Sequence, residues 1–179
     1  VEQLRVLAQL GFASALDART WKRAPLNLVA VVDKSGSMSG APLETVKQSL
    51  LQITDQLKPH DQLAIVLYGD RSHVHLPPTP LSKAHAIRTA IHAIASSGST
   101  YMEAGLELGF DVALRSRAAF AGDTRVMLFT DERPNVGATH KGSFMEMARR
   151  GSAKGIGLTT IGVGTHFGAE LAGAISSVR

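Results

Sequence analysis

Hydrophobic and polar positions follow two alternating patterns from residue 26 onward. Short apolar runs rich in β-branched residues are typical of buried parallel strands. They occur at residues 26–32, 63–68, 126–130 and 159–163. Residues 73–76 predict a short edge strand that ends before Pro77 and Pro78, because proline cannot continue the pairing.

The segments between these runs have helical spacing, and Pro42 stands near the first position of the first helix. Alternating strands and helices predict an α/β fold, with a doubly wound, mostly parallel central sheet, helices on both faces and one antiparallel edge strand. The expected inward-facing stripes are Leu43, Val46, Leu50, Ile53 and Leu57; Ile87, Ile91 and Ile94; Met102, Leu106, Phe110 and Ala113; and Phe144, Met147 and Ala148.

The length of 179 residues suits one principal domain at residues 26–179. Residues 1–25 form an N-terminal extension, with a strand expected where Leu4, Val6, Ala8 and Leu10 alternate and a polar crossover after it. The chain ends shortly after the apolar segment 171–175, so we expect the last strand of the sheet to be missing.

Composition and charge argue against two classes of function, nucleic-acid binding and membrane insertion. The net charge is +4, but the basic residues are scattered and aromatic residues make up only 5% of the chain, which argues against nucleic-acid binding. No apolar run approaches the roughly 20 residues of a membrane-spanning helix, so membrane insertion is not expected. The absence of cysteine excludes disulfides and cysteine-based zinc sites but leaves the compartment open.

The motif with the clearest chemistry follows the first buried run. Asp33, Ser35 and Ser37 are spaced so that a loop leaving a strand can turn their oxygens toward one point. Gly36 and Gly40 are expected to permit the tight backbone path. Taken alone, this motif has an equally good structural explanation, because serine, glycine and a capping aspartate are common in loops that precede helices.

Two further strand-end loops favour a metal site over that structural explanation. Asp131 follows the apolar run 126–130, and Thr100 precedes the third helix. Ligands in open parallel sheets bind at the carboxyl ends of the strands, where these loops meet. Hard oxygen donors of this kind suit Mg²⁺, with Mn²⁺ or Ca²⁺ also possible. The predicted metal ligands are Asp33, Ser35, Ser37, Thr100 and Asp131.

Residues 26–38, LNLVAVVDKSGSM, resemble the opening strand and metal-ion-dependent adhesion site of von Willebrand factor A domains. The most similar group is the bacterial one that also resembles inter-alpha-trypsin inhibitor heavy chains and calcium-activated chloride channel regulators. The resemblance covers residues 26–179. It implies metal binding through the hydroxyls of Ser35, Ser37 and Thr100, and through Asp33 and Asp131 directly or by way of water. It also implies that a partner's glutamate or aspartate takes the open position.

One departure from the family pattern concerns Glu132. The family usually has Thr-Asp-Gly where this chain has Thr130, Asp131 and Glu132. A third carboxylate here would strengthen Ca²⁺ binding, repel an acidic partner or simply point to solvent.

The leading hypothesis is therefore a cation-dependent protein-binding module with no catalytic residues, for which an extracytoplasmic or cell-surface location is favoured. A metal-dependent hydrolase is the alternative, with Glu132 and His166 as its local acid or base candidates. A scaffold subunit of a larger ATPase-linked assembly is a third possibility. Residues 162–164 do not complete a dinucleotide-binding motif, and His73 and His75 are interpreted as a surface pair.

Overall fold

A computed structural model describes residues 22–131 and 138–164, with side chains described at 22–131 and 144–164. Five strands form one sheet in the order β3-β2-β1-β4-β5. β1, β2, β4 and β5 run parallel and β3 pairs antiparallel with β2, so the predicted fold class is confirmed. The strand expected within residues 1–25 and the segment 171–175 lie outside the described residues. The strands are β1 (Leu26–Asp33), β2 (Gln62–Tyr68), β3 (His73–Pro80), β4 (Asp123–Thr130) and β5 (Ile156–Gly162).

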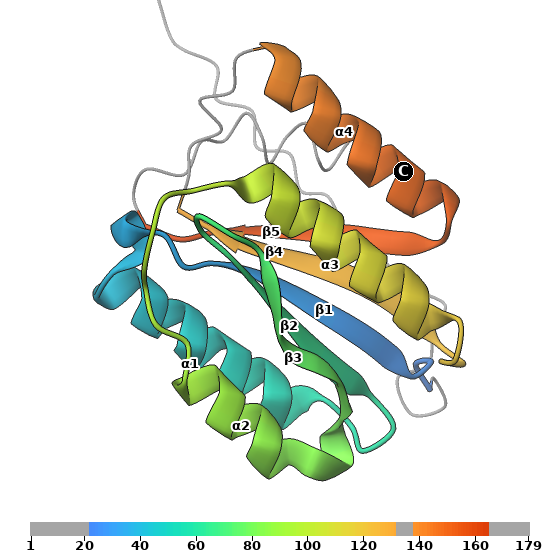
Figure 1. Ribbon diagram of the computed structural model, residues 1–179. Coiled ribbons are helices and arrows are strands. Elements are labelled where there is room, and N and C mark those ends of the chain that lie inside the picture. Colours follow the sequence, from blue (N-terminus) through green and yellow to red (C-terminus); the bar gives the residue numbers. More distant parts are fainter. Residues whose placement is uncertain (1–21, 132–137, 165–179) are drawn as a thin grey trace, which may run out of the picture.

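Helices cover both faces of the sheet (Figure 1). α1 (Ala41–Gln56) and α2 (Ala84–His92) lie on one face, and α3 (Met102–Arg117) and α4 (Ala138–Ala153) lie on the other. Short 3-10 turns precede α1 at Gly36–Met38 and α2 at Leu81–Lys83.

β1 is the central strand, as its continuous apolar run predicts. Its side chains alternate between two cores because successive residues of a strand point to opposite faces. Ala30 and Val32 belong to the core beneath α1 and α2, whereas Val29 and Val31 belong to the core beneath α3 and α4. Burial on both faces explains why this strand carries almost no polar residues between its two ends.

β3 differs from its prediction, because it continues through both prolines to Pro80. Leu76 pairs with Ile65 and Thr79 pairs with Leu63, and the register shifts between these two pairs. Pro77 and Pro78 therefore lie at an irregularity of the strand. An edge strand needs hydrogen-bonding groups on one side only, so proline is tolerated where the ladder is interrupted. The prediction that the strand ends before Pro77 is wrong for this reason.

α3 packs unusually close to the sheet through two glycines one helical turn apart. A Cβ atom at Gly109 would lie 2.3 Å from Cγ2 of Val31, and one at Gly105 would lie 2.6 Å from the ring of Tyr68. This glycine face leaves Met102 and Phe110, which were expected in the core, only half-buried. The close contact fixes the start of α3, and the loop that enters it, relative to β1 and β2.

A buried aspartate ties the amino ends of β1 and β2 together. The carboxylate of Asp61 accepts hydrogen bonds from the backbone N–H of Leu26, at 2.8 Å, and of Lys58, at 2.6 Å, and forms a salt bridge with Arg23. Burial acts to raise the pKa of Asp61, but the hydrogen bonds from Arg23, Lys58 and Leu26 and the charge of Arg23 outweigh it and lower that pKa to about 2.

Asp61 is therefore expected to make the stability of the domain depend on pH in the acid range. A folded-state pKa below the unfolded value of about 3.9 stabilises the fold above that value, and the gain is lost as the pH falls through about 2. The gain corresponds to about 2 kcal/mol at neutral pH. Urea unfolding of the parent and of Asp61→Asn at pH 6, 4 and 2.5 measures it. The variant should be less stable at pH 6 and should approach the parent at pH 2.5; parallel pH profiles would contradict this assignment.

Candidate functional site

The candidate site lies at the carboxyl ends of the parallel strands, at the left in Figure 1. β1 ends at Asp33, which is adjacent in the sheet to Tyr68, the last residue of β2. β4 ends at Thr130, directly before Asp131. The site is therefore assembled at the central strand and its two neighbours.

The carboxylate of Asp33 is fully buried. Its Oδ1 accepts a hydrogen bond from the backbone N–H of Ser35 at 2.8 Å. Its Oδ2 accepts bonds from the hydroxyl of Tyr68, at 3.1 Å, and from that of Thr130, at 3.3 Å. Among the described residues, each donor to this carboxylate is a neutral group.

These surroundings raise the pKa of Asp33. Burial is the largest cause, because a charged carboxylate loses its hydration. Hydrogen bonds from Ser35 and Tyr68 partly offset the effect, whereas the negative charge of Asp131 adds to it. The protein thus encloses a carboxylate without a described cationic side chain to balance it, and the position is electrostatically suited to a cation.

Two serine hydroxyls and a second carboxylate complete a cluster of oxygen atoms beside Asp33. Ser35 is buried and Ser37 is exposed, and their Oγ atoms are 3.0 Å apart. The hydroxyl of Ser37 donates to Oδ1 of Asp131 at 3.2 Å. The structure therefore brings together Asp33, Ser35, Ser37 and Asp131, and such a cluster of hard oxygens can bind a hard cation.

The two glycines of the motif have different roles. Gly40 has a φ of +77°, which residues with a side chain rarely adopt, so its predicted role is confirmed. Gly36 has no positive φ, and a Cβ atom there would meet only the Gly98 carbonyl at 3.7 Å. The expectation that Gly36 is needed for a tight backbone path is therefore wrong.

Thr100 lies in a loop that is hydrogen-bonded to the loop of Ser35 and Ser37. It is half-buried and lies two residues before α3. The backbone N–H of Gly36 donates to the carbonyl of Gly98 at 2.9 Å, which holds the loop of Thr100 against the loop of Ser35 and Ser37. Within the part of the chain that the structure describes, no hydrogen bond links the Thr100 side chain to the other four predicted ligands.

Sequence reasoning did not single out Tyr68 and Thr130, although both bind Asp33. The sequence could have indicated both residues, because each is the last residue of a strand that runs parallel and adjacent to β1. Polar residues at such positions lie at one edge of the sheet and deserve the same weight as the loop residues that follow them.

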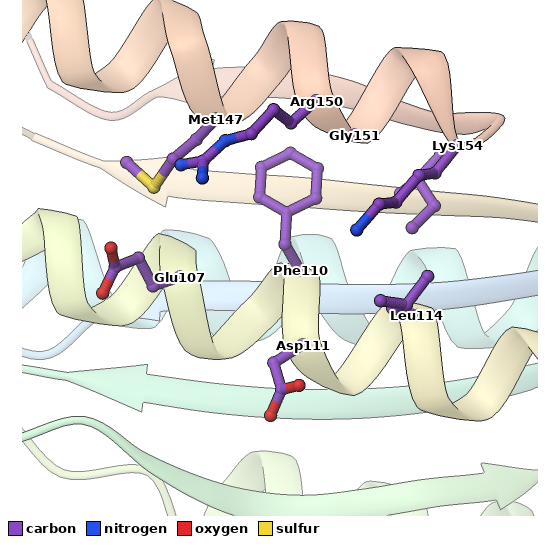
Figure 2. Close-up of a pocket in the computed structure, with 9 residues that line it drawn as sticks. Glu107, Phe110, Asp111, Leu114, Met147, Arg150, Gly151 and Lys154 are labelled. Carbon is purple, nitrogen blue, oxygen red and sulfur yellow. The ribbon is translucent and has the colours of Figure 1, made fainter.

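Other features of the described surface are separate from this cluster. Figure 2 shows a groove of about 250 Å³ between α3 and α4, in which the ring of Phe110 points toward Gly151. Glu107 and Asp111 line it on the α3 side, and Arg150 and Lys154 on the α4 side.

The two histidines of β3, exposed His73 and half-buried His75, form an edge-to-face pair with ring centroids 6.2 Å apart.

The remaining sequence predictions concern residues outside the described ranges or the membrane. Glu132 and His166 both lie outside the described residues. In the ranges 22–131 and 138–164, none of the helices has the length and apolar character needed to span a bilayer.

Comparison with known proteins agrees with the fold. The model of the von Willebrand factor type A domain matches residues 27–178, and the chain belongs to this family. Adhesion and protein interaction are what the family is known for.

Individual relatives and a solved structure are also similar to this chain. The chain is 34% identical to YfbK of Escherichia coli, covering 84% of this chain and 26% of YfbK. It is 30% identical to inter-alpha-trypsin inhibitor heavy chain H3 of Pongo abelii, covering 80% of this chain and 17% of that protein. The chain thus spans only a minor part of these relatives. Its fold is similar to that of the manganese-loaded TRAP protein of Plasmodium vivax, with a TM-score of 0.68, 22% identity, and coverage of 87% of this chain and 63% of the other.

The burial of Asp33 leads to a prediction for the metal-free protein. A folded-state pKa above the unfolded value means that the charged form destabilises the fold, so stability falls as the pH rises through the folded-state pKa. Asp33→Asn removes the charge and keeps the shape, and the hydroxyls of Tyr68 and Thr130 can accept as well as donate. In EDTA at pH 7 this variant should unfold at the same temperature as the parent or higher. A clear loss of thermal stability would show that the charged carboxylate itself stabilises the metal-free fold.

Proposed function

We propose that this chain is a divalent-cation-dependent protein-binding module. Asp33, Ser35, Ser37, Thr100 and Asp131 would hold Mg²⁺, with Mn²⁺ or Ca²⁺ as possible substitutes. The observation that carries the proposal is the fully buried carboxylate of Asp33, which is surrounded by neutral donors and lies beside a second carboxylate.

The spacing of the neighbouring oxygens supports the proposal. In an octahedral site with metal–oxygen distances of about 2.1 Å, adjacent ligand atoms are about 3.0 Å apart. The Oγ atoms of Ser35 and Ser37 are 3.0 Å apart, and Oγ of Ser37 is 3.2 Å from Oδ1 of Asp131. These three oxygens could occupy neighbouring positions around one ion with little movement.

Both oxygens of Asp33 already accept hydrogen bonds from the protein. This arrangement favours a role in which Asp33 orients the serine loop and contacts the ion by way of water. Mutation of such outer groups typically weakens metal binding by about 10- to 100-fold.

Hydroxyl-rich coordination with few acids leaves a bound cation partly unneutralised, so it would offer a positive centre to a partner's glutamate or aspartate. Ser37 and the half-buried Asp131 lie on the accessible side of the cluster. The manganese-loaded state of the TRAP protein supports a divalent ion in this fold.

Tyr101 is the expected second contact for a partner. It follows Thr100 directly and its side chain is 56% exposed. Exposed aromatic residues beside a polar site are frequent anchors of protein interfaces, because they bury a large area at a low cost in side-chain entropy. We infer that Tyr101 packs against the partner next to the carboxylate that approaches the cation.

A hydrolase and an ATPase-linked scaffold subunit remain the alternatives. The hydrolase depends on Glu132 or His166, which lie outside the described residues. Its test is turnover of phosphate-ester and peptide substrates in the presence of Mg²⁺. Turnover that is lost in Glu132→Gln or His166→Ala would favour this alternative over the binding module.

The first prediction from the proposed function concerns metal binding. A ligand that binds only the folded state raises the unfolding temperature, because it shifts the folding equilibrium. Mg²⁺ or Mn²⁺ in excess should therefore stabilise the parent, whereas Asp33→Asn should remain folded and respond weakly or not at all. Asp55→Asn, an exposed aspartate near the far end of α1, is the matched control and should respond as the parent does. An equal response of the parent and Asp33→Asn would place the ion elsewhere.

The second prediction concerns the partner. Peptides selected from a random library in Mn²⁺ should be rich in aspartate or glutamate, should be released by EDTA, and should lose binding when that acid becomes its amide. Tyr101→Ala should weaken peptide binding about tenfold or more without changing Mn²⁺ affinity. Leu114→Ala removes another exposed apolar side chain, 39% exposed and farther along α3, and should have no effect. Selected peptides that bind equally well in EDTA would contradict the proposed function.

A further inference from the structure

Asp70 holds the loop that carries Thr100. This exposed aspartate lies two residues after the end of β2, and its Oδ1 accepts two hydrogen bonds from one residue of that loop. The backbone N–H of Ser99 donates at 2.7 Å and the hydroxyl of Ser99 donates at 2.6 Å. Hydrogen bonds to an ionised acceptor are the stronger kind, and here both constrain the residue that directly precedes Thr100.

The backbone of the loop is shaped to receive this carboxylate. Gly98 has a φ of +84°, and a Cβ atom there would lie 2.3 Å from Oδ2 of Asp70. On the same side, a Cβ atom at Gly69 would lie 2.9 Å from the carbonyl oxygen of Ser97. The turn at residues 97–99 therefore packs directly on residues 69 and 70, and side chains at Gly69 or Gly98 would separate them.

The same turn also contacts the serine loop. The N–H of Ser97 donates to the carbonyl of Lys34 at 2.6 Å, and that of Gly36 donates to the carbonyl of Gly98 at 2.9 Å. The ammonium group of Lys34 also donates to Oγ of Ser97 at 2.7 Å. The turn is thus held by hydrogen bonds to Asp70 and to residues 34–36.

We propose that Asp70 is a positioning residue for the candidate metal site, because it fixes the turn that presents Thr100 beside Ser35 and Ser37. This inference rests on the proposed metal site. Asp70 does not bind the ion; it acts through Thr100, and its removal lets the loop leave the serine loop. The consequence for metal affinity should therefore depend on the presence of the Thr100 hydroxyl.

A second explanation for an effect of Asp70 on metal affinity is its negative charge, which would attract a cation from a distance without any role for the loop. The two explanations differ in a double-mutant cycle, because residues that act through one another are not additive, whereas independent effects add. Thr100→Ala supplies the second variant of the cycle. Asp55→Ala removes the same charge from an exposed position near the far end of α1 and is the matched control.

The test measures the dissociation constant for Mn²⁺ by electron paramagnetic resonance of the free ion. Asp70→Ala should weaken Mn²⁺ binding about tenfold, in the range seen for groups that orient metal ligands. In the Thr100→Ala background the same change should weaken binding less than about twofold. Ser99→Ala removes one of the two bonds to Asp70 and should have a smaller effect in the same direction. Asp70→Asn keeps an acceptor oxygen and should recover part of the affinity.

Amide hydrogen exchange provides a readout that requires no metal. In EDTA, Asp70→Ala should speed exchange of the Ser99 amide, whose bond to Asp70 is lost, while exchange within β1 stays unchanged. An equal loss of Mn²⁺ affinity in both Thr100 backgrounds, no loss at all, or unchanged Ser99 exchange would overturn the proposal. If the parent binds no Mn²⁺, the proposed metal site fails, and the exchange measurement still decides whether Asp70 holds the loop.

Discussion

The central constraint of this molecule is the enclosure of the Asp33 carboxylate at the end of the central strand. β1 is buried on both faces, and its last residue, Asp33, is fully buried. Tyr68 and Thr130 reach this carboxylate from the neighbouring strands, and the backbone of Ser35 closes over it. The packing of α3 also affects the Asp33 carboxylate, because Gly105 leaves room for the ring of Tyr68, whose hydroxyl donates to that carboxylate. The strands on either side of β1 thus supply hydrogen-bond donors to this buried carboxylate.

The two ends of β1 show what a cation changes. At the amino end, the buried carboxylate of Asp61 has Arg23 as its partner, and its pKa is lowered to about 2. At the carboxyl end, Asp33 has neutral donors and a nearby carboxylate, and its pKa is raised. An uncompensated buried charge is costly. Among the described residues, the carboxylate at the amino end has a cationic partner, whereas the one at the carboxyl end has none. A divalent ion at the carboxyl end would supply the missing charge, which unites the fold with the proposed function.

Much of this arrangement could be predicted from the sequence, because parallel strands bring their carboxyl ends to one edge. That rule placed Asp33, Ser35, Ser37 and Asp131 together. The ligand roles of these four residues and of Thr100 stay predictions. The continuous apolar run of residues 26–32 predicted the central position of β1. The rule that proline ends a strand failed at Pro77 and Pro78, because an irregular edge strand tolerates them. The contact of Asp70 with Ser99 had no sequence signal, since it depends on how two loops, 29 residues apart in the chain, meet in space.

A crystal structure of the protein grown with Mn²⁺ would test whether the enclosed Asp33 lies beside a cation, because the anomalous scattering of manganese locates the ion without assumptions about its ligands. We expect one strong peak at the carboxyl edge of the sheet, about 2 Å from the hydroxyl oxygens of Ser35 and Ser37 and close to Asp33 and Asp131. A peak bound by other residues, or no peak at saturating Mn²⁺ in crystals where this edge is open to solvent, would contradict it.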